Sequence, residues 1–333
     1  MDWDGCREFV NARMGLTMTT PQRAIVRAFY EGRRVRILAL AGCSKTTILL
    51  MCGLAWWYRS ANSGRIFHIV TYNKALQKET QHRIEALGMG ECVRAHTFHS
   101  FVGKCYKRTF RDDSALLQFL MEHRSALELQ QRVNEHFLRQ IGGVAGDELQ
   151  DLYALLFRAL SPVISLLQQR DDALPMAIVG DRHQIVHDYA LRGDNRADLK
   201  YLMGASIWGP PFDTKHLNEC HRFNAAHAAF VNATAWTSPY KVEGRKNVRG
   251  VPTYHFCENI YTALPKIVRA LLGRGDVRAG DLLVTADSVD TTKNSPVRAL
   301  AENLTKVRRN RRLEYPVHVK SKNAEAESVD QKV

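Results

Sequence analysis

The sequence predicts an α/β fold in which helices flank a parallel β-sheet, and three observations lead to this expectation. Apolar, β-rich segments alternate with helical segments along roughly the first 240 residues, as in parallel strands joined by crossover helices. One of these strands runs directly into a small-residue turn and then a helix, ALAGCSKTTILL. Polar and charged groups follow several strands at the ends where open α/β sheets bind ligands.

Each expected element has a local signal in the sequence. The first helix, 21–31, begins at Pro21 and spaces its apolar residues helically, and the amphipathic helix 73–88 ends at Gly88. The apolar runs predict strands at 34–40, 65–72, 91–97 and 173–184, a short strand and turn within 214–223, and a weak strand at 141–146, where the run IGGVAG is rich in glycine. Further helices are expected at 46–59, from 98, within 112–140, after 151 and from 225, whereas 192–212 has the composition of a loop.

The chain is long enough for about two domains. We expect a first α/β domain at 1–240, with a small helical insertion at about 105–142. A polar linker with Gly and Pro, near 238–250, precedes a second strand–helix series that begins with a strand at 251–257 and a helix through 263–273. This series predicts a partial second α/β domain at 241–320, followed by a disordered polar tail at 321–333.

Composition restricts the class of protein. Hydrophobic residues make up 45% of the chain, enough for a packed core, and the net charge of +13 favours polyanionic partners such as nucleic acid, although a basic surface also aids solubility. The 7 cysteines form no C-x-x-C pair, which favours a reducing compartment over a disulfide framework or zinc site. The acidic N-terminus has no signal-peptide core and no apolar stretch is long enough to span a bilayer, so we expect an intracellular protein.

The segment ALAGCSKTT has the order of a phosphate-binding loop: a buried strand, a tight turn and a helix N-terminus. Backbone N–H groups and the helix dipole favour an anion there, and Lys45 and Thr46 stand where phosphates and Mg²⁺ would be bound. The common pattern G-x-x-x-x-G-K-[ST] is broken twice, by Ala39 and by Ser44. A strand, loop and helix without a ligand also explain the segment.

Four further segments carry polar groups after strands, and each also has a purely structural explanation. DELQD (147–151) can hold Mg²⁺ and orient water, or can be a solvated helix start. GDRHQ (180–184) can sense a phosphate through Gln184, or can be a turn. AHTFHSF (95–101) suits contacts to a single strand, or core packing. ECHRF (219–223) carries Arg222, which can be an ordinary surface residue.

As an ordered series, these segments resemble the superfamily 1 DNA helicases of the UvrD/Rep type, including the F-box helicase branch. TTPQ is similar to the adenine-reading segment of that family, and ALAGCSKT to its loop A-x-A-G-x-G-K-T. VTYNKAL and AHTFHSF are similar to strand-binding segments, and DELQD, GDRHQ and ECHRF to the family's D-E-x-Q-D, G-D-x-x-Q and Arg segments. The resemblance covers residues 19 to about 235, and it implies a RecA-like P-loop NTPase domain followed by part of a second one.

The resemblance implies a role for each matching residue, with ATP and Mg²⁺ as cofactors and single-stranded or partly duplex DNA as partner. Gln22 would select adenine, Thr46 and Asp147 would hold Mg²⁺, and Glu148 would polarise the attacking water. Gln184 and Arg222 would couple the presence of the γ-phosphate to the binding of single-stranded DNA. The remaining nucleotide-binding positions implied are Ala41, Gly42, Cys43, Ser44, Lys45 and Thr47, and the DNA-binding positions are Tyr72, Asn73, Thr97, Phe98, His99 and Tyr189.

The sequence also departs from the family pattern. The Cβ of Ser44 replaces a glycine and costs about 1–2 kcal/mol if φ is positive there. Up to Val333 we find neither the T-x-H-x-x-K-G motif nor the terminal Arg-finger motif, so we expect an incomplete second motor domain and weak turnover by the chain alone. The basic cluster 308–312 predicts phosphate contacts, a nuclear localisation signal or a solvated helix end.

Three functions therefore compete: an ATP-dependent DNA helicase, with roles in repair or replication; a degenerate P-loop protein that binds DNA or a partner without turnover; and an unrelated P-loop kinase or GTPase. The paired DELQD and GDRHQ segments, and the lack of an N-K-x-D guanine motif, argue against the third.

Overall fold

The computed structural model describes residues 2–60, 63–152, 154–171, 174–181, 184, 212–234, 241–247, 250–253 and 255–278, with the single positions 282, 296 and 300. The chain divides into two compact units, Met1–Pro252 and Thr253–Val333. Each unit is described by itself. The predicted tail 321–333, the predicted loop 192–212 except its last residue, the basic cluster 308–312 and Tyr189 lie outside the described residues.

The first unit is built on a 6-stranded sheet with the order β3-β2-β4-β5-β1-β6. All of its strand pairs are parallel. The strands are β1 (Val35–Ala39), β2 (Ile66–Thr71), β3 (Val93–Thr97), β4 (Ile141–Gly146), β5 (Met176–Gly180) and β6 (Asp213–Leu217). The predicted α/β, RecA-like architecture, a parallel sheet with flanking helices, is confirmed for this unit.

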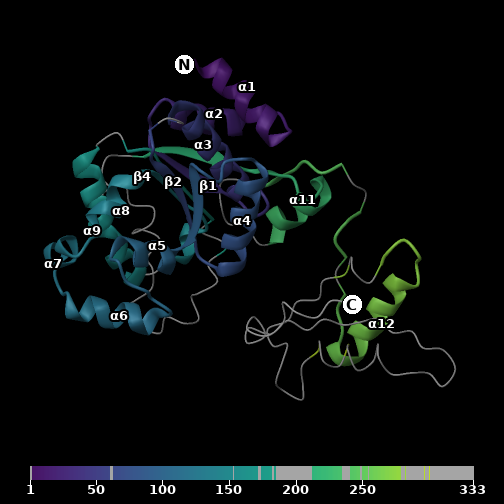
Figure 1. Cartoon of the computed structure of the whole chain (residues 1–333). Helices are drawn as coiled ribbons and strands as arrows, with labels where there is room; N and C mark the ends of the chain where they lie inside the picture. The colour runs from purple at the N-terminus through teal and green to yellow at the C-terminus, as the bar shows by residue number, and fades with distance from the viewer. Residues whose placement is uncertain are drawn as a thin grey trace. The chain divides into compact units, whose positions relative to one another are not determined.

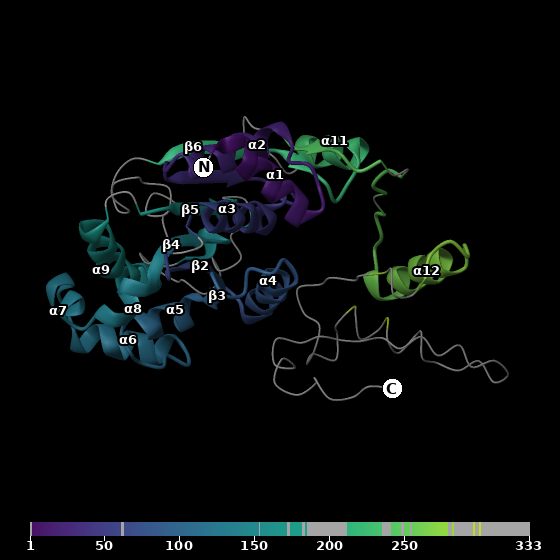
Figure 2. The ribbon, with the colours of Figure 1, turned by 45° about the horizontal axis from the view of Figure 1, so that its top comes forward.

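Helices cover both faces of the sheet, as Figures 1 and 2 show, and each face has its own hydrophobic core. One face carries α1 (Trp3–Met14), α2 (Thr20–Tyr30), α3 (Lys45–Ser60) and α4 (Lys74–Ala86). The other carries α5 (Phe98–Cys105), α6 (Asp113–Glu122), α7 (Ala126–Gln131), α8 (Glu135–Gln140) and α9 (Ala154–Arg170). Helices α6, α7 and α8 lie within the segment predicted as a helical insertion.

The central strand β4 is glycine-rich because large aromatic rings pack directly against its backbone. A Cβ on Gly142 would stand 2.4 Å from the Trp56 ring, and a Cβ on Gly143 would stand 2.7 Å from the Phe67 ring. The Trp56 indole also donates a hydrogen bond to the Gly142 carbonyl at 3.1 Å. The glycines that weakened the sequence signal are therefore what admits these rings, and β4 is buried along its whole length.

Helices α4 and α5 begin at the carboxyl ends of β2 and β3 through side-chain caps. Asn73 accepts a hydrogen bond from the Leu76 N–H at 2.6 Å, and Thr97 accepts one from the Ser100 N–H at 3.2 Å. Such caps satisfy backbone donors that a helix start leaves open. They fix where the chain leaves the sheet, next to Tyr72 and His99.

The first unit ends with a small two-stranded sheet, β7 (Glu219–Cys220) paired with β8 (Glu243–Gly244), beside α11 (Ala225–Thr234). A short 3-10 helix, η1 (Leu149–Asp151), follows directly after β4.

The second unit contains α12 (Ile260–Leu272), which agrees with the helix expected there. The strand predicted at 251–257 is wrong for the described residues of that segment, none of which pairs with another strand, and Phe256 is 86% exposed. An alternating apolar segment becomes a strand only when a neighbouring strand takes its backbone hydrogen bonds. Most of the predicted second α/β domain lies outside the described residues. None of the helices that can be described has the length and apolarity to cross a membrane.

Candidate functional site

The order of the sheet brings three sequence-predicted segments to one place. Strands β4, β5 and β1 are neighbours and run parallel, so their carboxyl ends share one edge of the sheet. The loop before Lys45 follows β1, Asp147 and Glu148 follow β4, and Gln184 follows β5. This edge is where α/β sheets bind ligands.

Lys45 is the centre of this group. Its ammonium donates a hydrogen bond to the Gln184 side-chain oxygen and lies 3.2 Å from a Glu148 carboxylate oxygen. Lys45 is 8% exposed and Glu148 26%, so the ammonium is largely shielded from solvent whereas the carboxylate is partly accessible. The structure thus joins the three strand ends through a single lysine.

Thr46 and Asp147 form a second link between β1 and β4. The Thr46 hydroxyl donates to an Asp147 carboxylate oxygen at 2.7 Å, and the Glu148 N–H donates to the other oxygen at 2.9 Å. Burial raises the pKa of the Asp147 carboxyl to about 6. A buried carboxylate beside a hydroxyl fits Mg²⁺, which takes few protein ligands together with water and phosphate oxygens.

Gln150 was not among the predicted site residues, although it lies within the DELQD segment. Its amide nitrogen donates to Glu148 at 2.6 Å, and its amide oxygen accepts the Asp181 N–H at 3.0 Å. Gln150 therefore fixes the Glu148 carboxylate relative to the end of β5. Glu148 has a φ of 50°, a left-handed backbone that non-glycine residues adopt at a cost and that occurs often at functional sites.

The loop between β1 and α3 is tightly enclosed. Gly42 has a φ of 74°, and a Cβ there would stand 2.5 Å from the Cys220 sulfur and 3.4 Å from the Arg222 Cδ. Arg222 therefore lies against this loop, and its contact with a γ-phosphate stays a prediction. Ser44 has a φ of 62°, so the condition for strain at this position holds. Burial raises the pKa of the neighbouring Cys43 thiol to about 12, so this thiol stays protonated.

Two other predicted nucleotide-binding residues have structural partners. The side-chain oxygen of Gln22 accepts the Thr19 N–H at 3.0 Å in a capping box at the start of α2. Thr47 accepts a hydrogen bond from Arg83 of α4 at 3.0 Å, a partner that sequence reasoning did not identify. Adenine selection by Gln22 stays a prediction.

Of the predicted DNA-binding residues, Tyr72, Thr97 and His99 line one groove at the ends of β2 and β3. Asn73 caps α4 beside them. The prediction for Phe98 is wrong, because its ring is 2% exposed in the core beneath α5 and cannot stack on a base. Within the part of the chain that can be described, no group of three or more His, Cys, Asp or Glu side chains is placed to hold a metal ion.

Comparisons with known proteins give a family match and several structural neighbours. Solved structures similar to this chain include two Pif1 helicases. The match to the Pif1 helicase from Candida albicans has 13% identity and a TM-score of 0.36, and it covers 61% of this chain and 40% of that chain. The match to Pif1 from Bacteroides sp in complex with ADP-AlF4 has 15% identity and a TM-score of 0.37, and it covers 65% of this chain and 45% of that chain. The chain thus spans less than half the length of these proteins. A search of curated proteins found no match.

A family model described as "AAA domain" matches residues 22–189. That segment is half of the 333-residue chain, and it contains the β1–α3 loop, Asp147, Glu148 and Gln184. The chain belongs to this AAA domain family.

Proposed function

We propose that this protein hydrolyses ATP and couples hydrolysis to movement along single-stranded DNA. The observation that carries the proposal is the convergence of Lys45, Asp147 and Glu148 at one edge of the sheet, with Thr46 and Gln184 in direct contact with them. These side chains supply the parts that phosphoryl transfer to water requires: a phosphate-binding cation, metal ligands and a carboxylate that orients water.

The ion pair of Lys45 defines how the site would work. Phosphate oxygens compete with Glu148 and Gln184 for the Lys45 ammonium. When Lys45 turns to the phosphates, the Glu148 carboxylate becomes available to orient a water molecule, and the Gln184 amide becomes available to the γ-phosphate. Thr46 and Asp147 would hold Mg²⁺, which neutralises charge on the phosphates. Arg222, which lies against the loop at Gly42, would add positive charge at the γ-phosphate.

Coupling to a single strand is supported by the adjacent ends of β2 and β3. Tyr72, Thr97 and His99 lie on the same edge of the sheet as Lys45, at the ends of β2 and β3, which are one and two strands beyond β4. The net charge of +13 favours a polyanion. The ordered motifs that resemble UvrD/Rep-type superfamily 1 helicases support the assignment to that superfamily, and the choice of branch is part of the proposal.

The decisive experiment measures steady-state ATP hydrolysis with and without oligo-dT. We expect the strand to stimulate the wild type and expect Lys45→Ala and Glu148→Gln to lose hydrolysis by at least about 100-fold, as for loss of a main stabilising group. Glu148→Gln should retain nucleotide binding, because Lys45 and Asp147 remain. Lys241→Ala, which removes an exposed lysine just before β8, serves as the control.

One observation favours the alternative of a protein that binds without turnover, namely the positive φ of Ser44 in the phosphate-binding loop. A Cβ there adds strain and bulk next to Lys45. If the wild type binds a fluorescent ATP analogue with micromolar affinity and shows no hydrolysis at any oligo-dT concentration, the alternative replaces the motor.

A further inference from the structure

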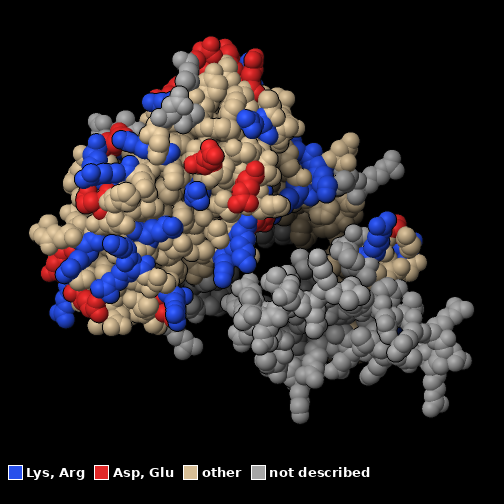
Figure 3. Space-filling model, viewed as in Figure 1, with Lys and Arg blue, Asp and Glu red and all other residues tan. Residues whose placement is uncertain are grey.

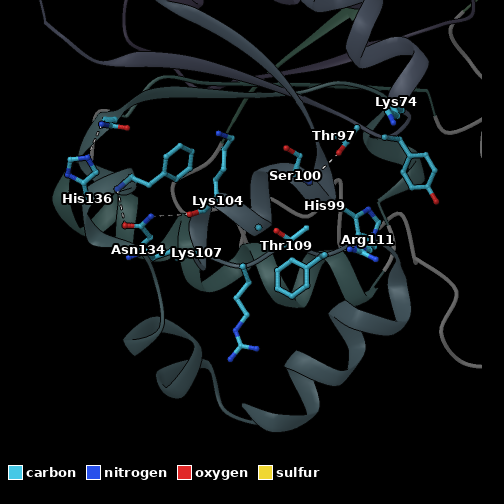
Figure 4. Close-up of a pocket in the computed structure, with 16 residues that line it drawn as sticks. Lys74, Thr97, His99, Ser100, Lys104, Lys107, Thr109, Arg111, Asn134 and His136 are labelled. Carbon is cyan, nitrogen blue, oxygen red and sulfur yellow. Dashed lines mark hydrogen bonds between the residues drawn. The ribbon is translucent and has the colours of Figure 1, made fainter. Parts of the chain in front are cut away.

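A basic groove lies at the carboxyl ends of β2 and β3, beside the proposed nucleotide site. Its volume is about 800 Å³, and its walls come from the ends of β2 and β3, from α5 and the loop after it, and from α8. Its cations are Lys74, Lys104, Lys107, Arg108 and Arg111, and no Asp or Glu is among the described residues that line it. Figure 4 shows the labelled cations spread along the pocket rather than gathered at one point.

Four of the cations in this groove form no ion pair among the described residues. Within the described part of the chain, Lys74, Lys104, Lys107 and Arg111 have no carboxylate partner within ion-pair distance. Figure 3 shows Lys and Arg side chains gathered over the region of α5 to α8. Like charges held together without counter-charges repel one another, so the cluster destabilises the protein unless an anion occupies it.

Lys107 gives independent evidence, because it occupies a backbone position that normally takes glycine. Helix α5 ends in a Schellman motif, in which the Arg108 N–H bonds the Gly103 carbonyl at 2.8 Å and the Lys107 N–H bonds the Lys104 carbonyl at 3.4 Å. Lys107 is the left-handed residue of this motif, with a φ of 53°. A lysine there costs about 1 kcal/mol relative to a residue without a Cβ, and strain of this kind is retained where the side chain has a use.

Contacts within the groove orient two of its other side chains. The Lys104 ammonium lies 6.0 Å from the centre of the Phe137 ring, which directs this cation across the groove toward α8. His99 lies 2.8 Å from Asp113, which holds the imidazole at the wall. Tyr72 adds an aromatic ring to the wall at the end of β2.

We infer that this groove binds the sugar–phosphate backbone of a single-stranded nucleic acid, with Lys104, Lys107 and Arg111 contacting phosphates and Tyr72 stacking on an unpaired base. The inference deepens the proposed function and rests on it for the choice of nucleic acid. Unpaired cations along a groove fit a chain of phosphates, and an aromatic wall fits a strand whose bases are free to stack. Duplex DNA offers no free base to Tyr72 and should bind more weakly.

The test is equilibrium binding of fluorescent oligo-dT, without nucleotide, over a range of salt concentrations. Each lost phosphate contact reduces the slope of log affinity against log salt by about 0.7, which corresponds to about fivefold weaker binding at 0.1 M salt. We expect Lys107→Gly to show this change in slope and affinity. The double variant Lys107→Gly with Lys104→Gln should show twice the change in slope. The control Lys241→Ala should leave slope and affinity unchanged.

Lys107→Gly is chosen because it removes the cation while it relieves the left-handed strain. Its unfolding free energy should therefore stay within about 1 kcal/mol of the wild type or increase, so that weaker binding does not result from misfolding. An unchanged salt slope in the stable Lys107→Gly protein would overturn the assignment of phosphate contacts to this groove.

Two further binding experiments test whether the groove binds a single strand. Tyr72→Leu should weaken oligo-dT about 5- to 150-fold by loss of stacking, whereas Tyr72→Phe should bind as the wild type does, and neither should change binding of heparin, which has no bases. Equal effects of Tyr72→Leu on heparin and oligo-dT, or tighter binding of duplex than of single strand, would overturn the single-strand assignment. Because these assays contain no ATP, a protein that binds with the expected slope but does not hydrolyse ATP would refute the proposed motor and leave the groove assignment standing.

Discussion

Ser44, the residue before the proposed phosphate-binding Lys45, has a left-handed backbone conformation that glycine adopts more easily than serine. At its φ of 62°, a Cβ costs about 1–2 kcal/mol. Replacement by glycine relieves this strain but adds about 0.5–1 kcal/mol of unfolded-state entropy. The free energy of unfolding of Ser44→Gly should therefore stay the same or rise by up to about 1.5 kcal/mol.

Nucleotide affinity is the more informative measurement for Ser44. If the Cβ crowds the phosphates, Ser44→Gly should bind a fluorescent ATP analogue about threefold or more tightly, which corresponds to about 0.7 kcal/mol or more. Ser44→Ala, which keeps the Cβ and removes only the hydroxyl, should bind as the wild type does. Equal affinity of the serine and glycine proteins would show that the loop accommodates phosphates with the Cβ in place.

His68 of β2 and His96 of β3 form a buried pair that makes stability depend on pH. The His68 Nδ1 and His96 Nε2 atoms lie 3.0 Å apart. Burial first, and then the neighbouring His96, Lys104 and Arg94 charges, lower the pKa of His68 to about 3, and burial lowers that of His96 to about 4. Both imidazoles are therefore neutral in the folded protein at pH values where the unfolded chain is protonated.

The sign of the effect follows from proton uptake. Between pH 6.5 and 4 the unfolded state binds more protons than the folded state, so stability falls as the pH falls, by up to about 2 kcal/mol per histidine at pH 5. Urea unfolding of the wild type and of His68→Gln at pH 7.5 and pH 5 tests this. The variant, which keeps a polar partner for His96, should lose less stability on acidification. The same pH difference in both proteins would exclude this origin.

At the scale of elements, β4 shows how packing by distant residues decides a strand. Gly142 and Gly143 admit the rings of Trp56 and Phe67, from α3 and β2. We expect Gly142→Ala to lower the free energy of unfolding by about 1–3 kcal/mol, as for other overpacked cores, measured by urea denaturation. The control is Gly90→Ala, whose Cβ would meet nothing closer than Glu85 Cγ at 3.8 Å. Similar losses in the two variants would contradict the steric explanation.

Helix α4 connects the groove to the phosphate-binding loop. Its N-cap is Asn73, next to Tyr72, and its Arg83 donates a hydrogen bond to Thr47, the residue after Thr46. We expect Arg83→Gln to reduce stimulation of ATP hydrolysis by oligo-dT about fivefold, equivalent to about 1 kcal/mol of coupling, with affinities for each ligand alone within twofold. Lys78→Ala on the same helix is the control. Unchanged stimulation would show that α4 carries no coupling through this bond.

Local patterns in the sequence predicted most of the sheet and most of the site at Lys45. The phosphate-binding loop could be predicted because strand β1, the small-residue turn and the start of α3 are contiguous in the sequence. The carboxylates after β4 also lie in one short segment. The strand at 141–146 looked weak because Trp56 and Phe67, which complete its packing, are remote in the sequence. Phe98 looked like a binding residue because its burial depends on the core beneath α5.

The groove could not be predicted for a similar reason. Lys74, Lys104, Lys107 and Arg111 come from two separate segments, and only the fold places them around one hollow without acidic residues. The strain at Lys107 was also hidden, because a lysine after a helix is ordinary until its backbone is known to be left-handed. Gln150 is part of the DELQD segment, but its role could not be predicted from it, because its hydrogen bonds to Glu148 and Asp181 depend on the distance between β4 and β5.

At the scale of the whole first unit, one edge of a single sheet carries both proposed ligands. The order β3-β2-β4-β5-β1-β6 places the groove at β3 and β2 and the nucleotide site at β4, β5 and β1. Parallel strands in one packed sheet form a rigid support, so a movement of Lys45 away from Glu148 can be transmitted to α4 and the groove. Binding of the two ligands should therefore be coupled.

Thermodynamic linkage makes this coupling a strict test. The factor by which a non-hydrolysable ATP analogue changes the affinity for oligo-dT must equal the factor by which oligo-dT changes the affinity for the analogue. We expect a factor of about 5 or more in the wild type and a smaller factor in Arg83→Gln, measured by fluorescence titration in both directions. A factor of one in the wild type, with both ligands bound, would mean that the two sites act independently and that the edge of the sheet does not transmit the state of Lys45.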